Sequence, residues 1–249
     1  MSFSGHNAVV TGTGGGMGLA TALQLLESGA TVTGVDLKEK PAELDAYGDK
    51  VNYVNGDVSD DAFVSKTVHE SYERAGRLDH LVNSAAVLLF GKDRGLVDLD
   101  LDVFDRVLEI NLRGPLQFAK HAIPLMQKSG GGSMVHISTV QCLRGDTAPQ
   151  EGYQTSKAGL VALSKSIAIQ YAKDQIRSNV IYPGPCFTPM QDRWVGDEAT
   201  QKAIADFVPI GRIGNADDMA NAISFLLSDK ASYITGTELI VDGGVTALP

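Results

Sequence analysis

The sequence predicts an α/β fold built from parallel βαβ units. Short runs rich in β-branched residues alternate with longer amphipathic runs along the whole chain, which is the pattern of strands joined by crossover helices. A length of 249 residues suits one large α/β domain or two small ones, and 43% hydrophobic residues suffice for a sizeable core. Because no Pro- or Ser-rich linker divides the chain, we expect residues 1–249 to form a single domain.

Composition argues against several functional classes. The net charge of −9 and the absence of a basic run disfavour binding to nucleic acid or to an anionic membrane. No apolar run approaches the roughly 20 residues that a bilayer crossing needs, and the N-terminus lacks the features of a signal peptide. Cys142 and Cys186 lie far apart without metal-type spacing. We therefore expect a reduced, cytoplasmic enzyme with no structural metal.

The first predicted unit is a strand, a glycine-rich turn, a helix and a second strand. The strand Asn7–Thr11 runs into the turn, the helix covers Leu19–Ser28, and the second strand is Thr31–Asp36. Glycines let backbone amides approach a pyrophosphate, and a helix N-terminus favours negative charge. The residues expected to contact a dinucleotide here are Gly12, Thr13, Gly14, Gly15, Gly16, Met17 and Gly18.

Asp36 ends the second strand and bears on the choice of cofactor. A carboxylate at this point can accept hydrogen bonds from both hydroxyls of the adenosine ribose. It would repel a 2′-phosphate by roughly 4 kcal/mol at 4 Å and an effective dielectric constant near 20, before screening by salt. The sequence therefore favours NAD over NADP, although Lys38 stands only two residues further on.

The third and fourth predicted strands are Val51–Asp57 and Leu78–Asn83, with a helix from Asp60 to Ala75 between them. Asp57, followed by Val58, either meets the adenine amine or caps the helix. Small residues at positions 84–86 would let a cofactor lie across the end of the fourth strand.

The second half of the chain continues the alternation. Residues 88–101 resemble a loop, and a long helix over Asp102–Gln127 is interrupted near Gly114–Pro115 and near Pro124. Asn111 is an awkward residue for the middle of that helix, because its side chain competes for backbone hydrogen bonds. The later predicted elements are the strands Met134–Ser138, Ile176–Ile181 and Glu238–Val241, a flap of short helices over about 186–212, and a helix over Asp217–Leu227.

Tyr153 and Lys157 are the candidate catalytic pair. They stand four residues apart at the start of an Ala-rich helical run, which places both side chains on one helix face. A phenol with an ordinary pKa of about 10 is a poor base at neutral pH. An ammonium group one turn away favours the phenolate, and we expect it to bring the phenol towards the range useful for proton transfer.

Taken together, these residues resemble the short-chain dehydrogenase/reductase family over nearly the whole chain. The matching motifs are T11-G-x-x-x-G-x-G18, Asp57-Val58, Asn83, Asn111, Tyr153-x-x-x-Lys157, Pro183-Gly184 and the tail from Gly211 to Gly244. The resemblance implies a doubly wound, Rossmann-like parallel sheet of seven strands with helices on both faces, and a homotetramer. Two departures are Ala86, where the family has glycine, and Cys186, where it often has isoleucine.

The resemblance also implies the roles of the site residues. Tyr153 would be the general acid/base, Lys157 would hold the nicotinamide ribose, and Asn111 would anchor a water that relays protons to Lys157. The carbonyl-polarising hydroxyl falls on Ser138 by residue type and on Thr139 by counting along the fifth strand. The remaining residues expected to contact the cofactor are Asn83, Pro183, Cys186 and Thr188.

The expected function is an NAD-dependent oxidation of a secondary alcohol or reduction of a ketone. The candidate substrate walls are apolar and aromatic, while Arg144 and Arg193 could instead meet a carboxylate or hydroxyls. Two alternatives are a reductase of 3-oxoacyl thioesters and a catalytically silent NAD(H)-binding regulatory protein. The acidic balance and Asp36 weigh against the first, and an intact Tyr153 and Lys157 weigh against the second.

Overall fold

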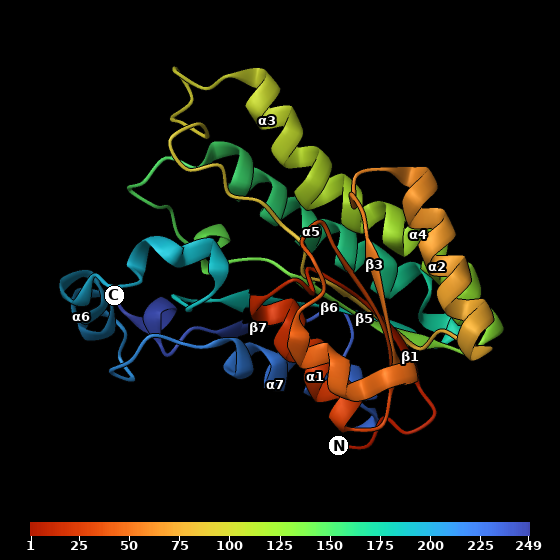
Figure 1. Cartoon of the computed structure of the whole chain (residues 1–249). Coiled ribbons are helices and arrows are strands. Elements are labelled where there is room, and N and C mark those ends of the chain that lie inside the picture. The colour runs from red at the N-terminus through yellow and green to blue at the C-terminus, as the bar shows by residue number, and fades with distance from the viewer.

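Seven parallel strands form one sheet at the centre of the molecule (Figure 1). The computed structural model describes all 249 residues. The strands are β1 (Asn7–Thr11), β2 (Thr31–Asp36), β3 (Val51–Asn55), β4 (His80–Asn83), β5 (Gly132–Ile137), β6 (Ile176–Pro183) and β7 (Glu238–Val241). Their order across the sheet is β3-β2-β1-β4-β5-β6-β7, and every neighbouring pair is parallel. The predicted fold, with a seven-stranded parallel sheet, is confirmed.

The winding of the chain reverses beside β1. It runs outward from β1 to β3 and then returns to β4, which pairs with β1 so that Val9 lies beside Leu81. In open α/β sheets, ligands bind beyond the carboxyl ends of the strands at such a reversal. The fold therefore places a binding crevice where the glycine-rich turn follows β1.

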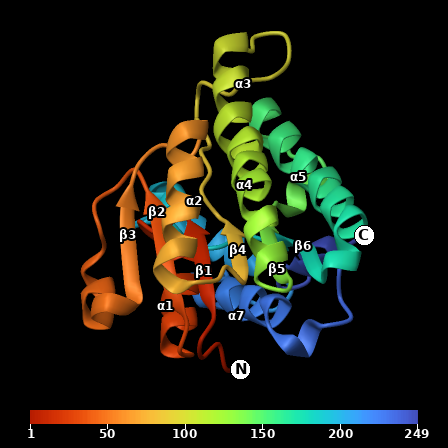
Figure 2. The same ribbon diagram turned by 90° about the vertical axis from the view of Figure 1, so that its right-hand side faces the viewer.

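Helices cover both faces of the sheet. They are α1 (Gly16–Glu27), α2 (Asp61–Ala75), α3 (Leu101–Leu108), α4 (Gly114–Lys128), α5 (Glu151–Gln170), α6 (Glu198–Phe207) and α7 (Ala216–Leu227). Figure 2 shows α2, α4 and α5 in one layer, with α1 and α7 on the opposite side of the sheet. One apolar core joins the sheet to α1 and α7 through Leu25 and Ile223, and a second joins it to α2 and α4 through Val68 and Phe118. None of the helices combines the length and apolarity that a bilayer crossing needs.

Local sequence explains where several helices begin and end. Asp60 caps α2, because its carboxylate accepts hydrogen bonds from the backbone amides of Ala62 and Phe63. Gly76 ends α2 in a left-handed conformation with φ 72°, which side chains rarely adopt. Asn215 and Asp218 form a reciprocal capping box at the start of α7.

Several predicted boundaries differ from the structure by one to three residues. Strand β3 ends at Asn55 rather than at Asp57, because the Asp57 carboxylate folds back to accept from the Ser59 amide at 2.9 Å. The long helix is divided into α3 and α4 by a π-helical turn over Glu109–Arg113, directly before the predicted break at Gly114. Pro124 lies inside α4 without ending it.

The predicted flap consists of a short 3₁₀ segment (Pro189–Trp194) followed by α6. Figure 1 shows α6 to one side of the main helical layers. The rings of Phe187 and Trp194 meet edge to face at 6.1 Å between centroids, which packs the start of the flap upon itself.

Candidate active site

A cavity of about 950 Å³ lies beyond the carboxyl ends of the central strands. Fifteen of the predicted site residues line it: Gly12, Gly14, Gly15, Gly16, Met17, Asp36, Asp57, Val58, Ser138, Thr139, Tyr153, Lys157, Pro183, Cys186 and Thr188. Four others do not: Thr13, Gly18, Asn83 and Asn111 lie behind the cavity wall. The fold therefore brings the dinucleotide residues and the candidate catalytic pair into one space.

The glycine-rich turn forms a cradle that side chains would fill. Gly12 has φ +78°, and a Cβ there would stand 2.8 Å from the Ala85 amide nitrogen. A Cβ on Gly18 would stand 2.3 Å from the Gly12 carbonyl oxygen, so Gly18 serves the packing of the turn rather than the cavity wall. Helix α1 begins at Gly16 with no acidic residue in its first turn. Its amides can therefore receive a pyrophosphate, and the turn fits a dinucleotide.

Thr11 holds the glycine turn against the end of β4. Its hydroxyl oxygen accepts from the amides of Ser84 and Ala85, both at 3.0 Å. The sequence indicated Thr11 only as part of the glycine motif. Its hydroxyl in fact joins the ends of β1 and β4, between which the crevice opens. Thr13, which was expected to contact the cofactor, is fully buried. A Cβ on Gly34 would stand 2.8 Å from the Thr13 hydroxyl oxygen, so the Thr13 side chain packs against β2. Its side chain points into the protein because β2 packs under the turn.

Asp36 is fixed at the cavity wall by two backbone amides. Its carboxylate accepts from the Gly14 amide at 2.8 Å and from the Lys38 amide at 2.9 Å. A Cβ at position 14 would come within 2.7 Å of the Asp36 carboxyl carbon, so a glycine is needed there. Each carboxylate oxygen keeps a second acceptor position, which leaves capacity for the hydroxyls of a ribose.

Asp57 lines the cavity as half of an ion pair. It does not cap α2, whose cap is Asp60. Its carboxylate accepts from the Ser59 hydroxyl at 2.7 Å and pairs with the Arg106 guanidinium at 2.7 Å. Burial alone raises the pKa of Asp57, but the hydrogen bonds from Ser59 and Arg106 outweigh burial and lower it. The sequence did not predict the role of Arg106, because nothing in the pattern of α3 shows that this side chain reaches the segment that follows β3.

Tyr153 and Lys157 lie on α5 against the same cavity. The Lys157 ammonium donates to the Ile137 carbonyl at 2.8 Å and stands 5.8 Å from the centre of the Tyr153 ring. Burial lowers the pKa of Lys157 to about 8. Burial raises the pKa of Tyr153 above its ordinary value, with a smaller contribution from the neighbouring Cys142. The expected lowering of the phenol pKa by Lys157 is thus absent here, because burial disfavours the charged forms of both groups.

The two candidate hydroxyls after β5 have different partners. Ser138 is 2% exposed, and its hydroxyl donates to the Lys157 carbonyl at 2.9 Å. Thr139 accepts weakly from the Gln141 amide at 3.4 Å. The proton of the Ser138 hydroxyl is therefore used to bind α5, whereas the Thr139 hydroxyl keeps its donor capacity.

The Asn111 side chain forms hydrogen bonds within the protein. It lies in the π-helical turn, fully buried, and exchanges two hydrogen bonds of 2.8 Å with the backbone of Val87. Its amide also donates to the Ser156 hydroxyl at 3.2 Å. The polar atoms of the Asn111 side chain thus have protein partners, and the expected anchoring of a water by this residue stays a prediction.

Asp93 supports the helix that carries the candidate catalytic pair, a contact that the sequence did not predict. It is 3% exposed, and its carboxylate accepts from the amides of Gly152 and Tyr153 at 2.9 and 2.8 Å. It thus caps the N-terminus of α5 from a loop some sixty residues earlier. The predicted loop over 88–101 contained this acid, but no sequence signal identifies the helix that it caps.

Asn83 lies behind the cavity in a buried polar chain. Its amide nitrogen is 3.1 Å from His136 Nδ1, and His136 Nε2 is 3.2 Å from the Ser178 hydroxyl. Burial, with the nearby charge of Lys157, lowers the pKa of His136 to about 4, so the ring is neutral. Because an amide nitrogen only donates, His136 Nδ1 accepts from Asn83, and the ring proton sits on Nε2. Asn83 therefore reaches a cofactor only through its neighbours on the strand end.

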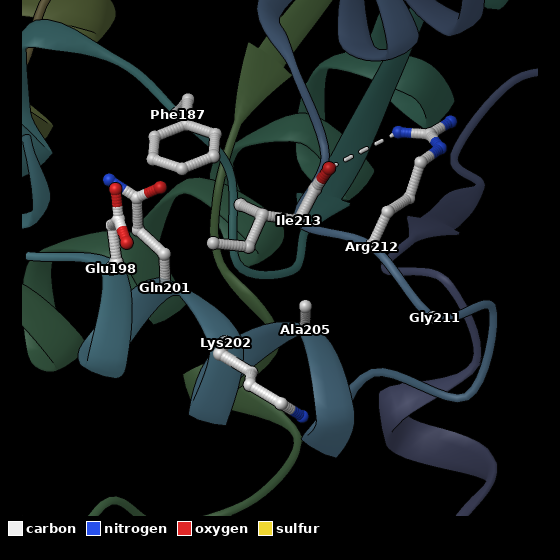
Figure 3. Close-up of a pocket in the computed structure, with 8 residues that line it drawn as sticks. All are labelled: Phe187, Glu198, Gln201, Lys202, Ala205, Gly211, Arg212 and Ile213. Atoms are coloured by element: carbon white, nitrogen blue, oxygen red, sulfur yellow. Dashed lines mark hydrogen bonds between the residues drawn. The ribbon is translucent and has the colours of Figure 1, made fainter.

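A smaller cavity of about 520 Å³ lies on the outer side of the flap (Figure 3). It shares no lining residue with the large cavity and contains none of the predicted site residues. Figure 3 shows Phe187 over one end of it, with Lys202 and Ala205 of α6 at the other and the Arg212 guanidinium turned outward. The candidate chemistry therefore belongs to the larger cavity.

Comparisons with known proteins agree with the fold. A family model described as enoyl-(acyl carrier protein) reductase matches residues 12–246. A crystal structure of a short-chain dehydrogenase/reductase from Burkholderia xenovorans superposes with a TM-score of 0.92, at 35% identity and over 99% of this chain and 98% of that one. This chain belongs to the short-chain dehydrogenase/reductase family.

Two curated relatives are named as a reductase and a dehydrogenase. Levodione reductase from Leifsonia aquatica is 35% identical over 258 aligned residues, which cover 98% of this chain and 96% of the relative. Cis-4-hydroxycyclohexanecarboxylate dehydrogenase from Sinomonas cyclohexanicum is 36% identical over 251 aligned residues, which cover 99% of each. As a short-chain dehydrogenase/reductase, this protein is an enzyme that interconverts alcohols and ketones with a nicotinamide cofactor.

Proposed function

We propose that this short-chain dehydrogenase/reductase is an NAD-dependent secondary-alcohol dehydrogenase or ketone reductase. The observation that carries the proposal is the single cavity lined by the glycine turn, Asp36, Tyr153 and Lys157. It joins a dinucleotide cradle to a proton-handling pair, which is what the removal of a hydride and a proton from a carbinol requires.

The cofactor would be held by this chain's own residues in three places. The amides at the start of α1 would receive the pyrophosphate, Asp36 would accept from the adenosine ribose, and Lys157 would bind the nicotinamide ribose. The segment Pro183–Thr188 would contact the nicotinamide end. When bound, nicotinamide supplies the hydride acceptor or donor, and its positive charge in the oxidised form favours ionisation of a nearby phenol.

The choice of NAD rests on Asp36. Its carboxylate is held in place by the amides of Gly14 and Lys38, so it cannot swing away from a 2′-phosphate without breaking two hydrogen bonds. The repulsion, roughly 4 kcal/mol at 4 Å before salt screening, favours a free ribose hydroxyl. The Lys38 side chain is exposed and offsets only part of that repulsion.

Tyr153 would exchange the substrate hydroxyl proton, and Thr139 would donate a hydrogen bond to the substrate oxygen. The contacts favour Thr139 over Ser138 for this role, because Ser138 already donates to the Lys157 carbonyl at 2.9 Å. Ser138 would then act as a clamp that keeps α5, and with it Tyr153, against the end of β5.

Two broader properties belong to the proposal. We expect a homotetramer, because α4 and α5 lie side by side in one outer layer and carry the exposed apolar residues Leu116 and Ile169. We also expect a cytoplasmic enzyme, in keeping with two free thiols, Cys142 and Cys186.

The 3-oxoacyl thioester reductase is the second candidate, because a 3-oxoacyl-[acyl-carrier-protein] reductase from Thermotoga maritima is 32% identical over 98% of this chain. A panel of secondary alcohols and 3-oxoacyl thioesters, assayed with NAD(H) and NADP(H), separates the two. We expect turnover of simple alcohols with NAD, and a loss of at least a thousandfold in Tyr153→Phe while NAD still binds. Turnover confined to acyl thioesters with NADPH would favour the second candidate, and NAD binding without turnover of any substrate would favour a regulatory protein.

A further inference from the structure

Two arginines line the substrate end of the large cavity without a carboxylate partner. Arg144 belongs to the loop after β5, and Arg193 belongs to the flap. Neither takes part in any ion pair of the structure. Arg144 donates to the Val245 carbonyl at 3.4 Å, and Arg193 Nε donates to the Gln191 side-chain oxygen at 3.1 Å. Most of their N–H donors therefore remain available to a ligand.

Aromatic rings hold both guanidinium groups. The Arg193 guanidinium lies 4.0 Å from the centre of the Phe90 ring, and the Arg144 guanidinium lies 5.4 Å from the centre of the Phe207 ring. Stacking on a ring restrains a guanidinium while leaving the N–H groups at its edge free. The arrangement preorganises two planar donors in a wall that is otherwise largely apolar.

The carboxylates of the cavity do not neutralise these arginines. Asp36 and Asp57 line the adenosine end, where their oxygens accept from Gly14, Lys38, Ser59 and Arg106. Asp146 follows Arg144 by two residues and serves its own loop, accepting from the Ala148 amide at 3.0 Å and from the Gln141 side chain. Asp192 directly precedes Arg193 but forms no ion pair with it. Both guanidinium groups are therefore free of direct contact with a carboxylate, in a chain whose net charge is −9.

We propose that the substrate is a hydroxy acid, or the corresponding keto acid, with an apolar body and a carboxylate that Arg144 and Arg193 bind. A carboxylate matches the fork of donors on a guanidinium, and the apolar body matches walls such as Leu88, Trp194 and Ile204. Because Arg193 belongs to the flap and stacks on Phe90, a bound carboxylate would also hold the flap over the cavity. This inference rests on the proposed function and names the substrate class of the same site.

The test compares 4-hydroxycyclohexanecarboxylate with its methyl ester, which keeps the ring and the hydroxyl but removes the charge. In the wild-type enzyme with NAD we expect kcat/KM for the acid to exceed that for the ester by about tenfold or more, mainly through KM, with a preference that weakens as salt rises. Arg144→Gln and Arg193→Gln should each lower the acid-to-ester ratio by about tenfold.

Lys202→Gln is the matched control, since Lys202 is a flap cation that lines the outer cavity and pairs with Asp206 at 2.6 Å. It should leave the acid-to-ester ratio unchanged. Equal use of acid and ester by the wild type, or a ratio unaffected by both arginine substitutions, would overturn the inference.

A binding measurement separates this inference from the proposed function. Calorimetry with cyclohexanecarboxylate and the NAD-bound protein should show binding that is at least tenfold weaker in both arginine variants and unaffected in Lys202→Gln. If no alcohol is turned over, the proposed function fails, and arginine-dependent binding of the acid would still support the carboxylate site. No binding to the wild type, or binding that is equal in all four proteins, would refute it.

Discussion

Ser138 and Thr139, which follow β5, carry neighbouring hydroxyls with different hydrogen-bond partners. Adjacent strand residues point to opposite faces, so one hydroxyl can serve the protein and the other the substrate. Ser138 donates to the Lys157 carbonyl, which leaves Thr139 as the hydroxyl with an unused proton. The sequence alone kept both residues as candidates and favoured Ser138 by residue type, whereas the contacts favour Thr139.

Replacing Thr139 should therefore affect catalysis more than replacing Ser138. We expect Thr139→Val, which keeps the shape and removes the hydroxyl, to lower kcat about a hundredfold, since one donor to the developing oxyanion is lost. Thr139→Ser should restore most of the activity, and Ser138→Ala should lower kcat less than tenfold. Steady-state kinetics on one good alcohol measures all three, and a larger loss in Ser138→Ala than in Thr139→Val would reverse the assignment.

A second residue-scale prediction concerns cofactor choice. Asp36→Asn keeps an acceptor for the Gly14 amide but removes the negative charge. We expect the ratio of kcat/KM with NAD to kcat/KM with NADP to fall about tenfold or more, because repulsion of the 2′-phosphate is lost. Asp45→Asn, which removes an exposed acid paired with Lys40, should leave the ratio unchanged. If the two variants behave alike, another group sets the preference.

At the scale of elements, the site depends on how α5 begins. Asp93 reaches from the loop before α3 and accepts from the first amides of α5, one of which belongs to Tyr153. The Asn111 side chain links the π-helical turn by hydrogen bonds to Val87 and to Ser156, which belongs to α5. Contacts from two distant segments thus fix the helix that carries the candidate catalytic pair, Tyr153 and Lys157.

Asp93→Ala should affect both stability and turnover. Loss of a helix cap costs roughly 0.5–2 kcal/mol of unfolding free energy. Because this cap also orients Tyr153, we expect kcat to fall about tenfold or more, with KM changed less. Asp60→Ala removes the matching cap of α2, which carries no catalytic residue. It should cost similar stability in urea unfolding yet retain kcat, and an equal loss of kcat in both variants would show that Asp93 acts through stability alone.

At the scale of the whole molecule, burial of Lys157 links stability to pH. The pKa of Lys157 in the folded protein, about 8, lies below its ordinary value of 10.5. At a pH between these two pKa values, the unfolded state therefore binds more protons than the folded state. Stability therefore gains from this group as pH rises through that window. Tyr153 acts in the opposite sense, because its raised pKa gives stability that is lost once pH rises above about 10.

The difference in unfolding free energy between the wild type and Lys157→Met isolates the contribution of Lys157 to the pH dependence of stability. We expect the unfolding free energy of the wild type to gain on the order of 2 kcal/mol relative to the variant between pH 8 and pH 10. Urea unfolding at constant ionic strength measures this difference. A difference that does not change with pH would mean that Lys157 keeps an ordinary pKa in the folded protein.

Much of the molecule followed from patterns that are local in the chain. The alternation of β-rich and amphipathic runs determined the α/β fold, because each element must bury its own apolar face. The spacing of glycines after β1, the acid at the end of β2 and the four-residue spacing of Tyr153 and Lys157 determined the two halves of the site, because each depends on neighbours along one element. Only the tertiary structure decided that Ser138 donates to the Lys157 carbonyl and that Asp57 pairs with Arg106. It alone also showed the Asp93 cap and the absence of an ion pair at Arg144 and Arg193. Each of these depends on groups brought together across tens of residues, and hydrogen bonds and charges are assigned by distance in space, which the order of residues does not encode.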